Sequence, residues 1–133
     1  MKNFRTLLSP KTLASGNWLE IRTTPFPGST EVYEYAHDIH CDSKAIAILV
    51  YRNVNKALQV LASMEIVPCH FSESGKQERR VTAITGMMEA GEQPDEAAVR
   101  ECLEETGYQV DTSELLSLGT VFPWKASDML VHL

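Results

Sequence analysis

The sequence of 133 residues lacks long apolar runs and any excess of basic charge. No stretch approaches the roughly 20 apolar residues that a membrane-spanning helix needs. The apolar core of a secretory signal is also missing from its first residues, MKNFRTLLSPKTLASG. The formal net charge is −6, and nucleic acids and anionic membranes are bound through basic patches. We therefore expect a cytoplasmic protein that binds neither.

Cysteine is scarce, with three widely spaced residues and no C-x-x-C pair. This pattern predicts reduced thiols rather than a disulfide framework. Cys41 lies in an H-x-x-H-C cluster with His37 and His40, but a structural zinc site needs four well-placed ligands. A polar turn entering a strand is the better interpretation. Cys69 and His70 lack the third orienting group that a nucleophile–base pair needs, so neither cluster is assigned a function.

One dense motif stands out, in the segment 86–108, GMMEAGEQPDEAAVRECLEETGY. Its skeleton consists of residues at fixed spacing: Gly86, Glu92, Arg100, Glu101, Glu104, Glu105 and Gly107. At ordinary residue usage, a chance match to these identities has a probability on the order of 10⁻⁹ per starting position. Composition alone does not account for the motif.

Local signals place a short helix over 94–106, after a loop over 86–93. Pro94 suits the first helical position, where a missing N–H costs nothing. Asp95 and Glu96 put negative charge near the positive end of the helix dipole. Gly107 can take the left-handed conformation that ends a helix. The apolar arc of this helix, expected to face a core, consists of Ala98, Val99, Cys102 and Leu103.

Three glutamates of this helix, at 101, 104 and 105, fall within an arc of roughly 100°. Close carboxylates repel each other by a few tenths of a kcal/mol per pair, so a purely structural helix gains nothing from them. Mg²⁺ prefers carboxylate oxygen as a ligand. A solvated acidic face is the usual explanation of a glutamate run. The other motif residues at fixed spacing, Gly86, Glu92, Arg100 and Gly107, favour a metal site instead.

The motif resembles the signature of the Nudix hydrolases, metal-dependent enzymes that cleave nucleoside diphosphates linked to another moiety. The resemblance implies an α/β/α sandwich with a mixed sheet. It also implies that Glu101, Glu104 and Glu105 bind Mg²⁺ or Mn²⁺, and that Glu104 and Glu105 are the catalytic residues. The backbone of Thr85 would be a further ligand. One departure is Cys102, at a position that is usually a larger aliphatic residue.

The remaining skeleton residues receive structural roles from the same resemblance. Glu92 and Arg100 look like an ion pair that ties the loop to the helix. Gly86 and Gly107 complete the structural part of the motif. The metal would neutralise a diphosphate, orient it and lower the pKa of the attacking water.

The length predicts one domain with a single core, residues 1–133. Hydrophobic patterning predicts strands at 18–22, 31–36, 45–51, 58–67, 79–84, 115–122 and 129–133, with a polar loop at 70–78. Residues 44–133 would form the catalytic core. Residues 1–43 resemble the accessory strands that ADP-ribose pyrophosphatases carry and often use to dimerise, so we expect a homodimer.

Pro123 narrows the expected substrate. It follows Tyr108 by 15 positions, a spacing that resembles the ADP-ribose pyrophosphatase branch. Pro123 and Trp124 are therefore candidate substrate-binding residues. Other aromatics that could stack on a base are Trp18, Tyr33 and Tyr35, although aromatics in strands are more often core residues. The favoured substrate is ADP-ribose or a related nucleoside diphosphate sugar.

The segment after the motif leaves the catalytic base open. Full-length relatives often supply a later glutamate, but none follows Glu114, and Asp128 is the only downstream carboxylate. Either the chain is truncated at Leu133, or another residue activates the water, or activity is weak. Two other functions therefore stay open: a nucleoside triphosphate pyrophosphatase that cleans the nucleotide pool, and a Nudix-like module that binds a nucleotide without cleaving it.

Overall fold

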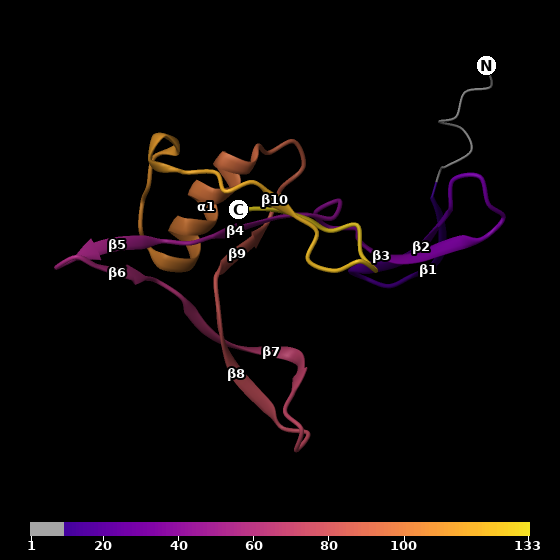
Figure 1. The fold of residues 1–133 in the computed structure, drawn as a ribbon, viewed down its shortest axis with the longest axis horizontal. Coiled ribbons are helices and arrows are strands. Elements are labelled where there is room, and N and C mark those ends of the chain that lie inside the picture. The colour runs from indigo at the N-terminus through magenta and orange to yellow at the C-terminus, as the bar shows by residue number, and fades with distance from the viewer. Residues whose placement is uncertain (1–9) are drawn as a thin grey trace.

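The computed structural model describes residues 10–133. Its N-terminal part is an antiparallel sheet of β1 (Lys11–Ser15), β2 (Leu19–Pro25) and β3 (Val32–Asp38) in that order. This accessory sheet extends to one side of the helix-bearing core (Figure 1). The strands predicted at 18–22 and 31–36 are confirmed and run longer. The first strand was not predicted, because KTLAS is fully exposed and carries little alternation.

A four-stranded mixed sheet forms the centre of the core. It contains β4 (Lys44–Ile48), β9 (Ile84–Met87), β10 (Thr120–Val121) and β11 (Leu130–His132), in the order β10-β11-β4-β9. The central strand, β4, pairs in parallel with β11 and antiparallel with β9. The apolar run at 45–51 is thus a central strand, as predicted, although it ends at Ile48.

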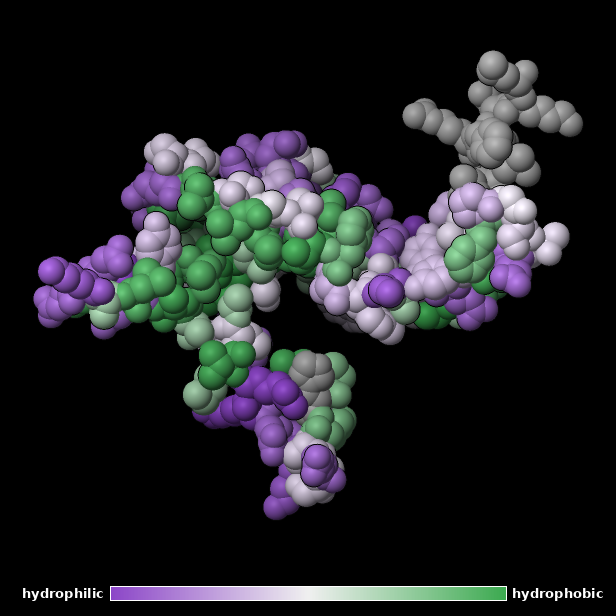
Figure 2. All heavy atoms as spheres, in the orientation of Figure 1, coloured by the Kyte–Doolittle hydropathy of each residue, from purple (hydrophilic) through white to green (hydrophobic). Residues whose placement is uncertain are grey.

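Two hairpins leave this sheet. The first joins β5 (Tyr51–Val54) to β6 (Ala57–Val60), and the second joins β7 (Ser63–Phe71) to β8 (Gln77–Thr82). The first turn uses Asn55 and Lys56, with φ of 50° and 66°. Both hairpins project from the core (Figure 1), and polar residues gather at the tip of the first (Figure 2). The predicted strand at 58–67 is therefore wrong as a single element, because Leu61 and Ala62 lie outside any strand and separate β6 from β7, which belong to different sheets.

The helix α1 (Pro94–Thr106) has the predicted bounds and packs on β4 and β9. Ala97 of the helix forms a buried cluster with Ile46 and Met88. Cys102 is 1% exposed, so the small cysteine is accommodated in a packed position. Leu103, expected to face the core, is 47% exposed, whereas Ala97 is fully buried. The buried stripe is thus rotated toward Ala97 relative to the predicted arc.

The segment after α1 departs most from the prediction. A 3₁₀ turn, η2 (Thr112–Glu114), precedes irregular chain, and only Thr120–Val121 of the predicted 115–122 strand is extended in a sheet. Beyond the two paired residues of β10, the Leu118 N–H donates to the Leu133 carbonyl and the Leu133 N–H donates to the Gly119 carbonyl, each at 2.8 Å. Leu115 and Leu116 lie outside this pairing. These leucines line a cavity of about 660 Å³ with β4 and α1.

The elements give an α/β architecture in which α1 covers one face of the mixed sheet. Residues 10–133 contain one α-helix, so only one helical layer of the expected sandwich lies within this part of the chain. Apolar side chains gather over this core (Figure 2). In the described range, no helix combines the length and apolarity needed to cross a bilayer.

Candidate active site

The loop and helix of the motif are fixed at both ends of α1. The Gln93 N–H donates to Glu96 Oε2 at 2.9 Å, which satisfies a backbone group before the first turn. Pro94 then begins the helix. At the other end, Gly107 has φ of 75° and its N–H donates to the Leu103 carbonyl at 2.9 Å. These contacts fix the two ends of α1.

Arg100 joins the helix to the loop through a two-point ion pair with Glu92. Its Nε lies 2.9 Å from Glu92 Oε1, and its Nη2 lies 2.9 Å from Glu92 Oε2. Nη2 also donates to the Met87 carbonyl at 3.0 Å, and the Glu89 N–H donates to Glu92 Oε2 at 2.9 Å. These bonds hold the loop against the helix.

The electrostatics of this pair follow from its geometry. Hydrogen bonds from the Arg100 guanidinium lower the pKa of the Glu92 carboxyl below its ordinary value. The same bonds, together with the one that Arg100 donates to Glu101, raise the pKa of Arg100. Both groups are therefore charged at neutral pH, and their side chains are only 26% and 13% exposed for Arg100 and Glu92. Partial burial makes the pair stronger than an exposed surface salt bridge.

Glu101 is buried against the backbone of Gly86. A Cβ added to residue 86 would lie 2.0 Å from Glu101 Cδ and 2.2 Å from Oε1, distances that no real contact allows. Glycine is therefore required at residue 86 for the Glu101 carboxylate to occupy this position. The sequence marked both residues, but it did not show that one makes room for the other.

Two motif carboxylates converge on one positive atom. Arg100 Nη1 lies 2.8 Å from Glu101 Oε1 and 3.3 Å from Glu104 Oε2. Oxygen donors that share a cationic partner suit a hard divalent ion by their chemistry. Among the residues described, however, no group of three or more potential ligands is arranged for a metal. Glu101, Glu104 and Glu105 are the residues that would hold one, and this role stays a prediction.

Glu105 faces a separate hollow of about 340 Å³ at the C-terminal end of α1. Its lining consists of Leu61, Ala62, Ser63, Ile84, Glu105, Thr106 and Tyr108. Sequence reasoning missed the contribution of residues 61–63, because nothing local indicates that the base of the second hairpin lies beside the helix end. Tyr108 was noted only as the last residue of the motif.

The remaining predicted site residues are dispersed. Thr85 lies exposed in β9, directly before Gly86. Trp124 is 61% exposed in the loop after β10. That loop lies against β3, since the Ala36 N–H donates to the Ala126 carbonyl at 2.8 Å. The structure therefore places the Pro123–Trp124 loop beside the accessory sheet.

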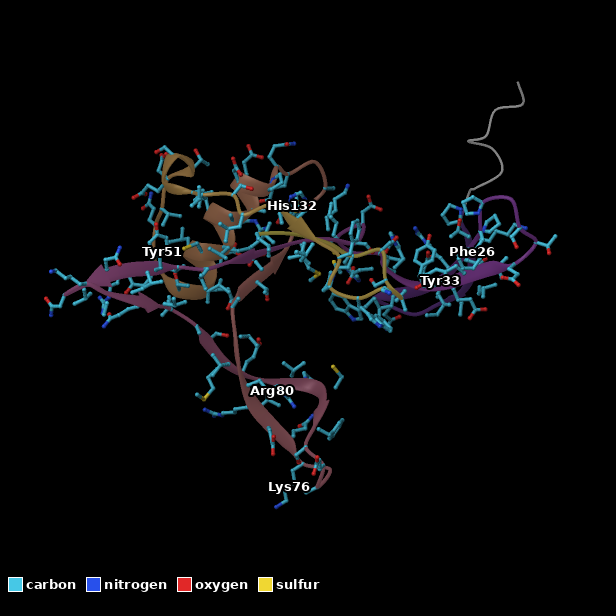
Figure 3. The ribbon with its side chains drawn as sticks, viewed as in Figure 1. Phe26, Tyr33, Tyr51, Lys76, Arg80 and His132 are labelled. Carbon is cyan, nitrogen blue, oxygen red and sulfur yellow. The ribbon has the colours of Figure 1, made fainter. Side chains whose placement is uncertain are left out.

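The aromatic residues considered for stacking already have contacts in that sheet. Tyr33 donates its hydroxyl proton to the Lys125 carbonyl and packs edge-on against Phe26, with ring centroids 5.8 Å apart. Figure 3 shows these two side chains together on the accessory sheet, away from α1. Trp18 stacks on His40 at a centroid distance of 4.0 Å.

The histidine cluster of the sequence joins the accessory sheet to the C-terminal segment. His37 is buried, and its Nδ1 lies 2.8 Å from Asp128 Oδ2 and 3.1 Å from Ser43 Oγ. Asp128, the one downstream carboxylate, is therefore engaged with β3. Both contacts use the same ring nitrogen, so the three residues lack the relay geometry of a hydrolytic triad. The cluster therefore has a structural role, because it connects β3 to Ser43 and Asp128.

Comparison with known families supports the motif. A family model described as the NUDIX domain matches residues 43–133, more than half of the chain and all of the motif. No curated protein matches the sequence. The mixed sheet with α1 on one face is the α/β fold expected of that family.

Proposed function

Because the chain belongs to the Nudix hydrolase family, we propose that it hydrolyses the diphosphate linkage of ADP-ribose or a related nucleoside diphosphate sugar. The products are a nucleoside monophosphate and a sugar phosphate. The main observation that supports this proposal is the geometry of the motif. Gly86 makes room for Glu101, and the Glu92–Arg100 pair holds the loop against the helix.

The chemistry rests on the carboxylates of α1. Glu101, Glu104 and Glu105 would hold Mg²⁺, with Mn²⁺ as a substitute, since all three are oxygen donors on one helix. A bound divalent ion supplies charge neutralisation for the diphosphate and lowers the pKa of water. Glu104 and Glu105 are the more exposed and can accept a proton from that water. The backbone of Thr85 would contribute a further oxygen.

Two observations support the sugar-diphosphate class over other Nudix substrates. Pro123 stands 15 residues beyond Tyr108, the spacing noted for the ADP-ribose branch. The accessory sheet β1–β3 precedes the family-matched region, which begins at residue 43. We propose on the same grounds that Pro123 and Trp124 border the substrate.

We further propose that the protein is a homodimer assembled through the accessory sheet. Large apolar side chains lie exposed on it, including Leu13, Trp18, Leu19, Ile21 and Val32, each at least 40% exposed. Exposed apolar surface on a sheet favours pairing with another protein surface, and most homo-oligomers are two-fold dimers. The expected readout is a dimer mass by light scattering.

The cysteines support a cytoplasmic location. Cys41, Cys69 and Cys102 are free thiols, and the first and last are buried. Burial raises the pKa of the Cys41 thiol, which keeps it in the unreactive protonated form. Free buried thiols are typical of proteins in reducing compartments.

A substrate panel tests the proposal. The full chain with Mg²⁺ is incubated with ADP-ribose, UDP-glucose, GDP-mannose and deoxynucleoside triphosphates, and released phosphate monoesters are measured. We expect turnover of one or more sugar diphosphates. Turnover of triphosphates alone would instead establish the nucleotide-pool pyrophosphatase.

One observation favours a second candidate, a module that binds a nucleotide without cleaving it. Arg100 Nη1 already neutralises Glu101 and Glu104, two of the three carboxylates needed for the metal. If no compound turns over while ADP-ribose raises the melting temperature, this candidate replaces the hydrolase.

A further inference from the structure

Tyr108 is the aromatic residue that lines the hollow beside Glu105. The side chains of Leu61, Ala62 and Ile84 supply apolar lining, and those of Ser63, Glu105 and Thr106 supply polar groups. The volume of about 340 Å³ lies within the range of small-molecule sites. An apolar hollow with a few polar groups, next to a candidate catalytic carboxylate, is where substrate contacts are expected.

The backbone around Tyr108 is fixed by the end of the helix. Gly107, at φ of 75°, reverses the chain direction. The Tyr108 N–H then donates to Thr106 Oγ1 at 3.1 Å, and that hydroxyl donates to the Cys102 carbonyl at 2.5 Å. The Tyr108 backbone is therefore fixed beside the hollow, and the residue is 57% exposed.

The far side of the hollow is also held in place. Ser63 Oγ and Thr82 Oγ1 lie 2.8 Å apart across the base of the second hairpin. Thr82 Oγ1 lies 2.8 Å from Glu65 Oε1, to which it donates. These contacts fix the strand that carries Ser63 opposite the helix end. The hollow is thus bounded by a hairpin base and a capped helix.

We propose that Tyr108 is a specificity-determining residue on which the base of the nucleoside substrate stacks. The inference rests on the proposed function, because it assigns a binding surface next to Glu105, one of the carboxylates proposed for that function. The other aromatics weighed for this role do not line the hollow; Tyr33 packs on Phe26, and Trp18 stacks on His40. Tyr108 and Glu105 line the same hollow, so a base stacked on Tyr108 would lie on the side of α1 that carries Glu105.

Calorimetric titration with AMP and with ribose 5-phosphate tests the proposal on the full chain. Replacing Tyr108 with alanine should weaken AMP binding by roughly 5- to 100-fold, the range measured for base–aromatic stacking. Tyr108→Phe keeps the ring and should retain AMP affinity. Ribose 5-phosphate has no base, so its affinity should not change in either variant.

Tyr51 offers a matched control. It is 58% exposed, nearly the same as Tyr108, but it lines the other cavity. Figure 3 shows it at the start of the first hairpin. Tyr51→Ala should leave AMP binding at the wild-type value. Loss of AMP affinity in Tyr51→Ala but not in Tyr108→Ala would overturn the proposal, as would wild-type protein that does not bind AMP.

A second readout separates this proposal from the hydrolase function. Stacking on a tyrosine shifts the adenine proton resonances of AMP upfield, and that shift should vanish in Tyr108→Leu, which keeps an apolar side chain. The shift needs no turnover, so it supports the Tyr108 site even if the substrate panel is negative. Turnover in the wild type without this shift would leave the hydrolase intact and overturn the role of Tyr108.

Discussion

The carboxylate of Glu101 occupies the space that a side chain on residue 86 would need, with Glu101 Cδ 2.0 Å from the position of a Cβ there. Gly86 is in β9 and Glu101 is in α1, so this contact sets how closely the helix approaches the sheet. Close approach is also what brings Arg100 within reach of the Met87 carbonyl. The spacing of the motif is thus explained by packing as well as by chemistry.

Replacing Gly86 with alanine should displace Glu101 and destabilise the protein. Overpacking of a buried contact costs typically about 1–3 kcal/mol, and metal-dependent turnover should fall as well. Gly16→Ala is the control, since a Cβ there meets only the Leu19 carbonyl at an ordinary 3.5 Å. Thermal melting measures the difference. Equal melting temperatures for the two variants would contradict the Gly86–Glu101 contact.

The Glu92–Arg100 pair predicts an acid-sensitive contribution to stability. The folded-state pKa of Glu92 is lowered, so the contribution is full above the unfolded value of about 4.3 and is lost as pH falls through the lowered pKa. Glu92→Gln should therefore be less stable than wild type at neutral pH, with a gap that closes below about pH 4. Urea unfolding from pH 7 to pH 3 measures this gap.

The matched control for that series is Glu73→Gln, on the exposed turn between β7 and β8. It should unfold like wild type at every pH. A gap between wild type and Glu92→Gln that stays constant down to pH 3 would contradict the prediction, because it would show that the gap does not depend on the charge of Glu92.

Glu105→Gln should remove most metal-dependent turnover and leave the fold intact. Loss of a group that binds metal or moves a proton costs roughly 10²–10⁴-fold in rate. Because residue 105 is exposed and one of a row of like charges, the melting temperature should not fall. Glu31→Gln, in the loop before β3, is the control and should keep the wild-type rate of turnover. Wild-type rates in Glu105→Gln would exclude Glu105 from the site.

Asp128→Asn should loosen the accessory sheet without removing turnover. The variant weakens the contact with His37 Nδ1, now 2.8 Å, beside the Ala36–Ala126 backbone bond. Amide exchange at Ala36 should accelerate by roughly 10- to 100-fold, as expected for losing a charged hydrogen bond. Asp111→Asn, which alters only the cap of η2, should leave that amide unchanged. A large loss of turnover in Asp128→Asn would make Asp128 a candidate base after all.

The helix could be predicted to the residue because its signals are local. Pro94 and Gly107 each act within one turn of the ends they define, and no distant contact overrides them. The exposure of Leu103 could not be predicted in the same way. Helical periodicity gives an apolar arc, but the position of β4 and β9 decides which edge of that arc is covered, and it favours Ala97.

The strand predicted at 115–122 failed for a non-local reason. Its leucines have strand-like hydrophobicity, but a strand needs a neighbour with free backbone groups, and β11 offers three residues. The hollow at Tyr108 could not be predicted from the sequence either. It joins residues 61–63 to the helix end, segments more than 40 positions apart that no sequence pattern connects.

The parallel pairing of β4 with β11 has a consequence for how the protein is made. Leu130 pairs with Lys44, so the chain must extend 86 residues beyond Lys44 before that edge is closed. On the ribosome, β4, β9 and α1 can assemble while the outer edge of β4 is still open to other strands. The contacts of the two hairpins are local and can form early, whereas the pairings of β11 with β4 and β10 must wait until Leu130–His132 have been made.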